Sequence, residues 1–193
     1  KFNWSRETFD RVNWPAIKSA QKQLPDVQRR FTVKMFTRWF PLNHRQHELF
    51  GGPTPNCLTY GAEETHEHMY RCQPRTIWRQ ELNTALRSLL TELKTPTEMK
   101  LVILGSIQDE LESVPEPERL GYRQPDSLLT WSDFIMGRID TNWENKMDAV
   151  YETIPKCTRT GSQWTVQVIK LLWDKMYQVT ACFRYQIPGR LST

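Results

Sequence analysis

Hydrophobic residues recur at intervals of three and four along most of the chain, and no segment alternates convincingly between apolar and polar positions. This spacing places apolar side chains on one face of a helix. The clearest stripe runs from residue 74 to about 94, and Pro74 stands where a helix often begins. A second stripe runs from Thr97 to about residue 111. The pattern therefore predicts an all-α fold.

The remaining stripes predict helices over residues 13–24, 26–40, 126–143 and 162–187, and a short helix that includes His68 and Cys72, so that about seven helices are expected. Turn-forming residues are dense over 51–57, and three prolines hold a loop open near 114–125. We therefore divide the chain into a basic helical segment (1–54), a small irregular insertion (55–74) and a helical region (75–193). A further boundary is possible at 114–125.

Composition excludes two classes of protein. Aromatic residues make up 11% of the 193 residues, which argues against a disordered chain. The longest apolar runs, 101–104 and 168–173, are far shorter than the roughly eighteen residues that cross a bilayer, so no membrane span is expected. The four cysteines lack the spacing of a disulfide framework, which favours an intracellular location in the cytoplasm or nucleus. The chain begins without Met or a leader pattern and is expected to be a fragment or a processed product.

Positive charge is concentrated near the N-terminus. Residues 1–50 contain ten Lys or Arg and four Asp or Glu, a balance of +6, whereas residues 51–193 carry −2. Within the predicted helix 26–40, Arg30, Lys34 and Arg38 follow one another at intervals of four, about 6 Å apart. Arg29 and Arg45 could extend this row, which suits contacts with the phosphates of RNA or DNA. The alternative is the solvated face of an ordinary amphipathic helix.

Two cysteines and two histidines lie close together in the irregular segment. Zn²⁺ prefers four sulfur and nitrogen ligands in a tetrahedral arrangement. The spacing of four between His68 and Cys72 puts both on one face of a helix, and Gly61 allows the turn that returns the chain. Small buried cysteines and solvated histidines without a metal are the alternative. The predicted zinc ligands are Cys57, His66, His68 and Cys72.

The order Cys57, two residues, Tyr60, Gly61, Glu63-Glu64, Glu67-His68 and Cys72 resembles the zinc-binding segment that follows the polymerase domain in reverse-transcriptase-like proteins of non-LTR retrotransposons, including protist open reading frames. Segments 24–42, 134–143 and 161–173 resemble the surroundings of that zinc knuckle. The resemblance implies an accessory region that holds RNA or DNA, with zinc on Cys57, His68 and Cys72.

Tyr60 occupies the position of the second cysteine of this motif, which would be the fourth ligand, so the resemblance implies a degenerate zinc site. His66 could replace the missing ligand, water could complete the site, or the metal could have been lost. Among the aromatic residues, Tyr70 beside Arg71 is the best candidate for stacking on an unpaired base. Most tryptophans are expected in the core.

The sequence contains no paired-aspartate motif of the kind that polymerases use to hold two metal ions, so catalysis of polymerisation is not expected in this chain. The predicted function is nucleic-acid binding as an accessory region of a retroelement-derived protein. The alternative is a metal-free helical domain, derived from such an element, that binds a protein partner or serves as a scaffold.

Overall fold

A computed structural model describes residues 4–37, 42–58, 60–72, 75–113, 124 and 126–185, with side chains as far as residue 180. These residues form ten helices and no strand, which confirms the predicted all-α class. The predicted number of about seven helices is wrong. The extra helices are short or arise where one predicted helix is divided in two.

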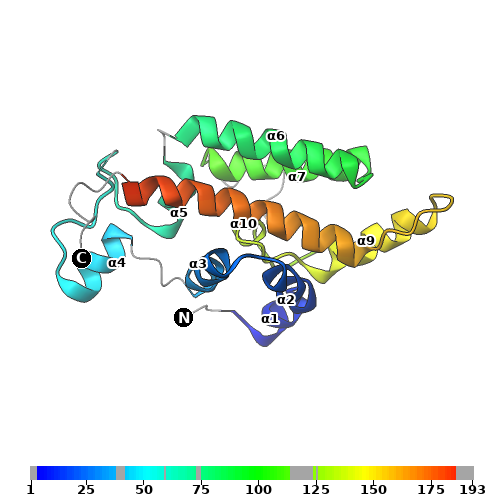
Figure 1. The fold of residues 1–193 in the computed structure, drawn as a ribbon, viewed down its shortest axis with the longest axis horizontal. Coiled ribbons are helices and arrows are strands. Elements are labelled where there is room, and N and C mark those ends of the chain that lie inside the picture. Colours follow the sequence, from blue (N-terminus) through cyan, green and yellow to red (C-terminus); the bar gives the residue numbers. More distant parts are fainter. Residues whose placement is uncertain are drawn as a thin grey trace.

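The helices follow one another along the chain, and Figure 1 shows their arrangement. Their bounds are α1 Arg6–Arg11, α2 Trp14–Lys22, α3 Asp26–Phe36, α4 Asn43–Phe50, α5 His66–Arg71, α6 Thr76–Glu92, α7 Thr97–Leu111, α8 Trp131–Ile135, α9 Thr141–Glu152 and α10 Gly161–Tyr185.

The apolar stripes that predict the helices become their buried faces. In α6, Trp78, Leu82, Leu86 and Leu90 recur every four residues and are all buried. At the start of α2 the side chain of Asn13 accepts a hydrogen bond from a backbone N–H of the first turn, which satisfies a donor that has no partner within the helix. Sequence periodicity and capping chemistry therefore account for the main helices.

Helix α10 is the centre of the molecule. It packs against α2, α3, α5, α6 and α9, and in Figure 1 it crosses the molecule between the α6–α7 pair and the N-terminal helices. Trp164 and Trp173 on α10 are fully buried, and their indole N–H groups donate to Thr95 Oγ1 at 2.8 Å and to the Met136 carbonyl at 2.9 Å. One hydrophobic cluster extends from Val12 to Val179. The N-terminal segment and the C-terminal region therefore share one core, while most of the possible boundary at 114–125 lies outside the described residues.

The prediction of a single helix over 126–143 is wrong, because Gly137 separates α8 from α9. Gly137 has φ +81°, a left-handed conformation that favours glycine. A Cβ at this position would lie 2.5 Å from Nε1 of Trp173. The apolar residues on either side of Gly137 still face the core. Their spacing therefore looks like that of one continuous helix and does not reveal the break.

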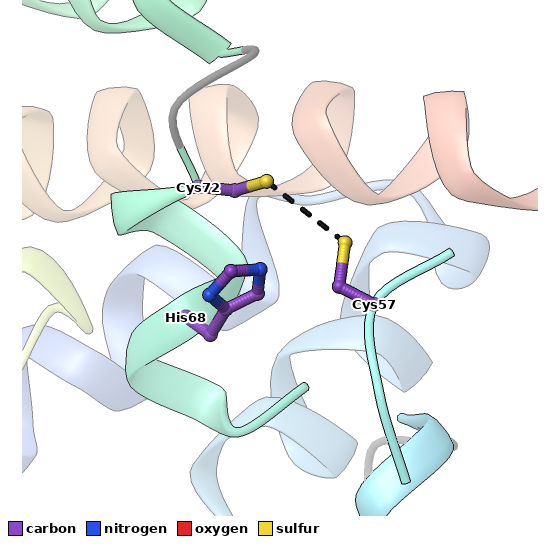
Figure 2. Close-up of side chains that lie close together, drawn as sticks. All are labelled: Cys57, His68 and Cys72. Atoms are coloured by element: carbon purple, nitrogen blue, oxygen red, sulfur yellow. Dashed lines mark hydrogen bonds between the residues drawn. The ribbon is translucent and has the colours of Figure 1, made fainter. Parts of the chain in front are cut away.

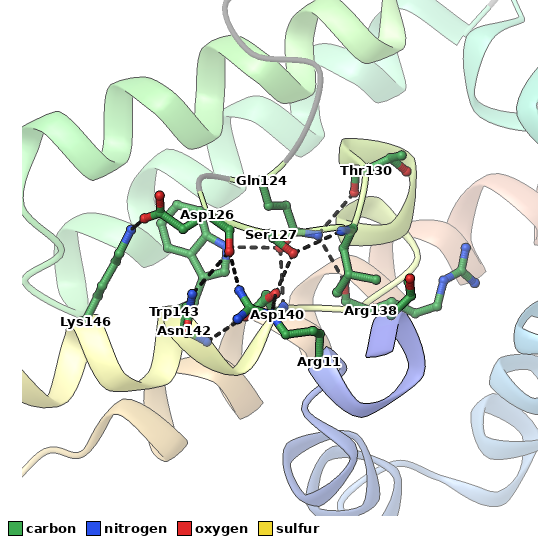
Figure 3. Close-up of polar contacts among 12 residues, drawn as sticks. Arg11, Gln124, Asp126, Ser127, Thr130, Arg138, Asp140, Asn142, Trp143 and Lys146 are labelled. Carbon is green, nitrogen blue, oxygen red and sulfur yellow. Dashed lines mark hydrogen bonds and ion pairs between the residues drawn. The ribbon is translucent and has the colours of Figure 1, made fainter. Parts of the chain in front are cut away.

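Buried polar contacts join the N-terminal helices to the segment before α9 (Figure 3). The carboxylate of Asp140 is fully buried, and its Oδ2 accepts from Nε of Arg11 at 2.8 Å and from the hydroxyl of Ser127. Its Oδ1 accepts from the backbone N–H of Asn142 at 2.8 Å and so caps α9. These contacts join the end of α1 to the segments on either side of α8.

Within the described residues, no helix combines the length and the apolar character needed to cross a membrane.

Candidate metal centre

Residues 56–58 and 60–63 form the two sides of a tight hairpin that positions Cys57. An antiparallel bridge joins Asn56 to Glu63. Inside it the backbone N–H of Cys57 donates to Ala62 O, and that of Gly61 donates to Cys57 O, both at 2.7 Å. Gly61 has φ +78°, which a residue with a side chain rarely adopts. The predicted turn is thus present, and Cys57 is only 2% exposed.

Helix α5 positions the other two donors. Its N-cap residue, Thr65, accepts a hydrogen bond from the backbone N–H of His68 at 3.1 Å. The backbone N–H of Cys72 donates to the carbonyl of His68 at 2.9 Å, which continues the helical spacing to the end of the segment. Because His68 and Cys72 are four residues apart, both side chains lie on the face toward Cys57, as Figure 2 shows.

The three side chains form a group that could hold a metal ion. One donor atom from each of Cys57, His68 and Cys72 lies within 4.8 Å of the others. The two sulfur atoms are 3.9 Å apart, and both cysteines are free. Zinc–sulfur bonds of about 2.3 Å at the tetrahedral angle require sulfur atoms about 3.8 Å apart. The observed separation fits a shared metal ion.

The imidazole of His68 supports this interpretation. Its Nε2 is buried and has no hydrogen-bond partner among the described residues. A buried polar atom without a partner costs about 1–3 kcal/mol. Burial, and then the positive charge of Arg75, lower the pKa of His68, which favours the neutral imidazole that binds metals. A metal ion would give this nitrogen the partner that it lacks.

The thiol of Cys72 is affected by its burial as well. Burial, and then the adjacent Cys57, raise the pKa of Cys72 to about 11. Without a cation, this thiol is therefore protonated at neutral pH. Burial disfavours the charged thiolate, and a divalent ion bound to it offsets this cost with its positive charge.

Helix α4 supports the hairpin from outside. The backbone N–H of Asn43 donates to Oε2 of Glu64 at 2.7 Å, and the Asn43 side chain donates to Asn56 O at 2.8 Å. Burial raises the pKa of Glu64, whose residue is 4% exposed, while the bond from Asn43 opposes that rise. The sequence names Glu64 only as part of the motif and does not predict its contact with Asn43, because nothing in their spacing shows that the two residues meet.

The fourth predicted ligand, His66, is the first residue of α5 and does not belong to the group of three. The structure thus brings together Cys57, His68 and Cys72, the same three residues that the resemblance implies. Tyr60 lies beside them, with its ring centroid 6.0 Å from that of His68 and the two planes 21° apart.

The predicted basic row is only partly available for binding. Arg30 and Lys34 are exposed on α3, and no described residue forms an ion pair with either. Arg29 is exposed but pairs with Asp26. Arg38 lies outside the described residues, and Arg45 pairs with Glu48 at 2.7 Å. The open part of the row is therefore the α3 surface around Arg30 and Lys34.

The proposed contact of Tyr70 with an unpaired base is wrong. Tyr70 is 0% exposed, and its hydroxyl lies 2.7 Å from that of Ser132, so the ring has no free face for stacking. Arg71 forms an ion pair with the buried Glu110, and its Nε donates to the Glu110 carbonyl at 3.0 Å. These two residues hold α5 against α7 and α8.

Comparisons with protein-family models, curated proteins and solved structures found no match to this chain. The fold and the site therefore define the protein only as an all-α domain with a Cys-His-Cys group suited to a metal ion.

Proposed function

We propose that this chain is a zinc-binding accessory region of a retroelement-derived, reverse-transcriptase-like protein, and that it binds RNA or DNA. The Cys57–His68–Cys72 group carries the proposal. Two sulfur donors and one nitrogen donor are the ligands that zinc prefers, and the buried nitrogen of His68 has no hydrogen-bond partner in the described part of the chain. Zinc would fix the hairpin to α5 and so stabilise this end of the domain.

The nucleic-acid part of the proposal rests on α3. Arg30 and Lys34 are exposed one helical turn apart, about 6 Å along the axis, and the first fifty residues carry a charge of +6. Contacts with phosphates release counterions, so binding should weaken steeply with salt.

The double variant Arg30→Gln/Lys34→Gln tests this surface. We expect it to bind a labelled single-stranded oligonucleotide more weakly and to reduce the slope of log affinity against log salt by about 1.4, because each of the two side chains neutralises one phosphate and each such contact with a single strand contributes about 0.7 to the slope. Fluorescence anisotropy at several salt concentrations measures both quantities. The control is Arg87→Gln/Lys94→Gln, which removes the same charge from exposed positions on and just after α6. Equal weakening in both variants, or an affinity that does not change with salt, would remove α3 as the binding surface.

A metal-free domain that binds a protein is the second candidate. Large apolar side chains are exposed at several places, with Phe50 at 80%, Leu58 at 72% and Ile77 at 71%. Folded protein that holds no zinc and ignores nucleic acid would favour this alternative.

A further inference from the structure

A cleft of about 670 Å³ lies against the metal-ligand group. Tyr60 and His68 belong to its lining, together with Arg71 and Arg79. Since His68 is both a candidate ligand and part of the wall, the cleft reaches the edge of the candidate metal centre. This volume is in the range of small-molecule sites in proteins.

The protein supplies only three clustered donors on the described residues. A zinc site with three protein ligands keeps a fourth position for an exchangeable ligand, whereas a structural site has four protein ligands. Tyr60 is 52% exposed, and its ring centroid lies 6.0 Å from that of His68 with the two planes 21° apart. Tyr60 and His68 thus stand next to each other in the wall of the cleft.

Charge in the cleft disfavours anions. Glu63, Glu67 and Glu112 contribute three carboxylates to the lining, against the guanidinium groups of Arg71 and Arg79. The charge of Arg71 is already matched by the buried Glu110 outside this lining. Oε1 of Glu63 also lies 2.7 Å from Nδ1 of His44, but the lining still holds one more carboxylate than guanidinium groups. This surplus of negative charge repels phosphates and thiolates and does not repel a neutral nitrogen donor. Imidazole is such a donor near pH 7, and it is flat enough to lie against an aromatic ring.

We propose that the zinc centre is an open one, and that its fourth position takes a neutral imidazole, the side-chain group of histidine, from this cleft while Tyr60 covers that position without being a ligand. The inference rests on the metal binding proposed above. It also separates this cleft from the α3 surface, which suits phosphates.

Cobalt(II) substitution tests the inference, because the visible spectrum of Co²⁺ depends on its ligands. We expect the cobalt-loaded wild-type protein to change its spectrum saturably as imidazole is added, with the metal retained, and to show no change with the same concentrations of inorganic phosphate. Tyr60→Phe should behave like wild type. Tyr60→Cys adds a third thiolate and should abolish the response.

Each contrary result has a distinct meaning. If cobalt does not bind at all, the proposed function fails and this inference fails with it. If cobalt binds but imidazole has no effect, only the open position is wrong. A response that appears only in His66→Gln identifies His66 as the fourth ligand, and a changed spectrum of Tyr60→Phe without imidazole identifies the phenol. A response to phosphate but not to imidazole contradicts the assigned ligand class.

Discussion

At Gly137 the backbone and a tryptophan side chain leave no room for a Cβ. The residue has φ +81°, and the nearest atom to an added Cβ, Nε1 of Trp173, also donates the hydrogen bond to Met136 O. Gly51 at the end of α4 has a similar φ of +63° but open space around it. An alanine at Gly51 would therefore be strained only in its backbone, whereas an alanine at Gly137 would be strained in its backbone and also crowded by Trp173.

We expect Gly137→Ala to lower the free energy of unfolding by about 2–5 kcal/mol, the sum of about 1–2 kcal/mol for a left-handed alanine and about 1–3 kcal/mol for an overpacked core. Gly51→Ala should lower the free energy of unfolding only by the cost of a left-handed alanine, about 1–2 kcal/mol. Urea denaturation followed by circular dichroism measures both. If both variants lower the free energy of unfolding equally, the side chain of Trp173 moves away from the added Cβ at no cost in stability.

At the scale of single elements, the long amphipathic helices were predictable and the short ones were not. The stripes of α6 and α7 each place a residue in the core at nearly every turn, so the sequence alone indicates them. Helices α1 and α4 contain no buried residue, and therefore have no stripe to detect. The break between α8 and α9 falls at Gly137, whose left-handed conformation cannot be inferred from the apolar period, because that period continues across it.

Helix α5 has only six residues, so its N-cap should matter for the metal centre that it carries. Thr65→Ala removes the acceptor for the His68 N–H and costs about 1 kcal/mol. We expect zinc affinity to fall about fivefold, measured by competition with a chromogenic chelator.

The matched control is Ser5→Ala, which removes the equivalent cap from the six-residue α1. Its zinc affinity should equal that of wild type. If Thr65→Ala binds zinc as tightly as wild type does, the N-cap hydrogen bond of Thr65 does not contribute to metal binding.

At the scale of the whole molecule, the candidate site was more predictable than its surroundings. Cys57, His68 and Cys72 were identifiable because their side chains match the ligands of zinc and two of them share a helical face. The burial of Tyr70 was not predictable. Only the packed structure shows that its ring is enclosed and that its hydroxyl is hydrogen-bonded to Ser132. The pairing of basic residues with nearby carboxylates was likewise visible only in three dimensions.

The central claim is that Cys57, His68 and Cys72 hold one zinc ion. Mass spectrometry of metal content, on protein purified without added metal, tests it most directly beside the Cys57→Ser/Cys72→Ser variant. The account predicts one zinc per wild-type chain and none in the variant, with helical content checked by circular dichroism. A wild-type chain that is folded and contains no zinc, and that takes up none when zinc is supplied, would contradict it.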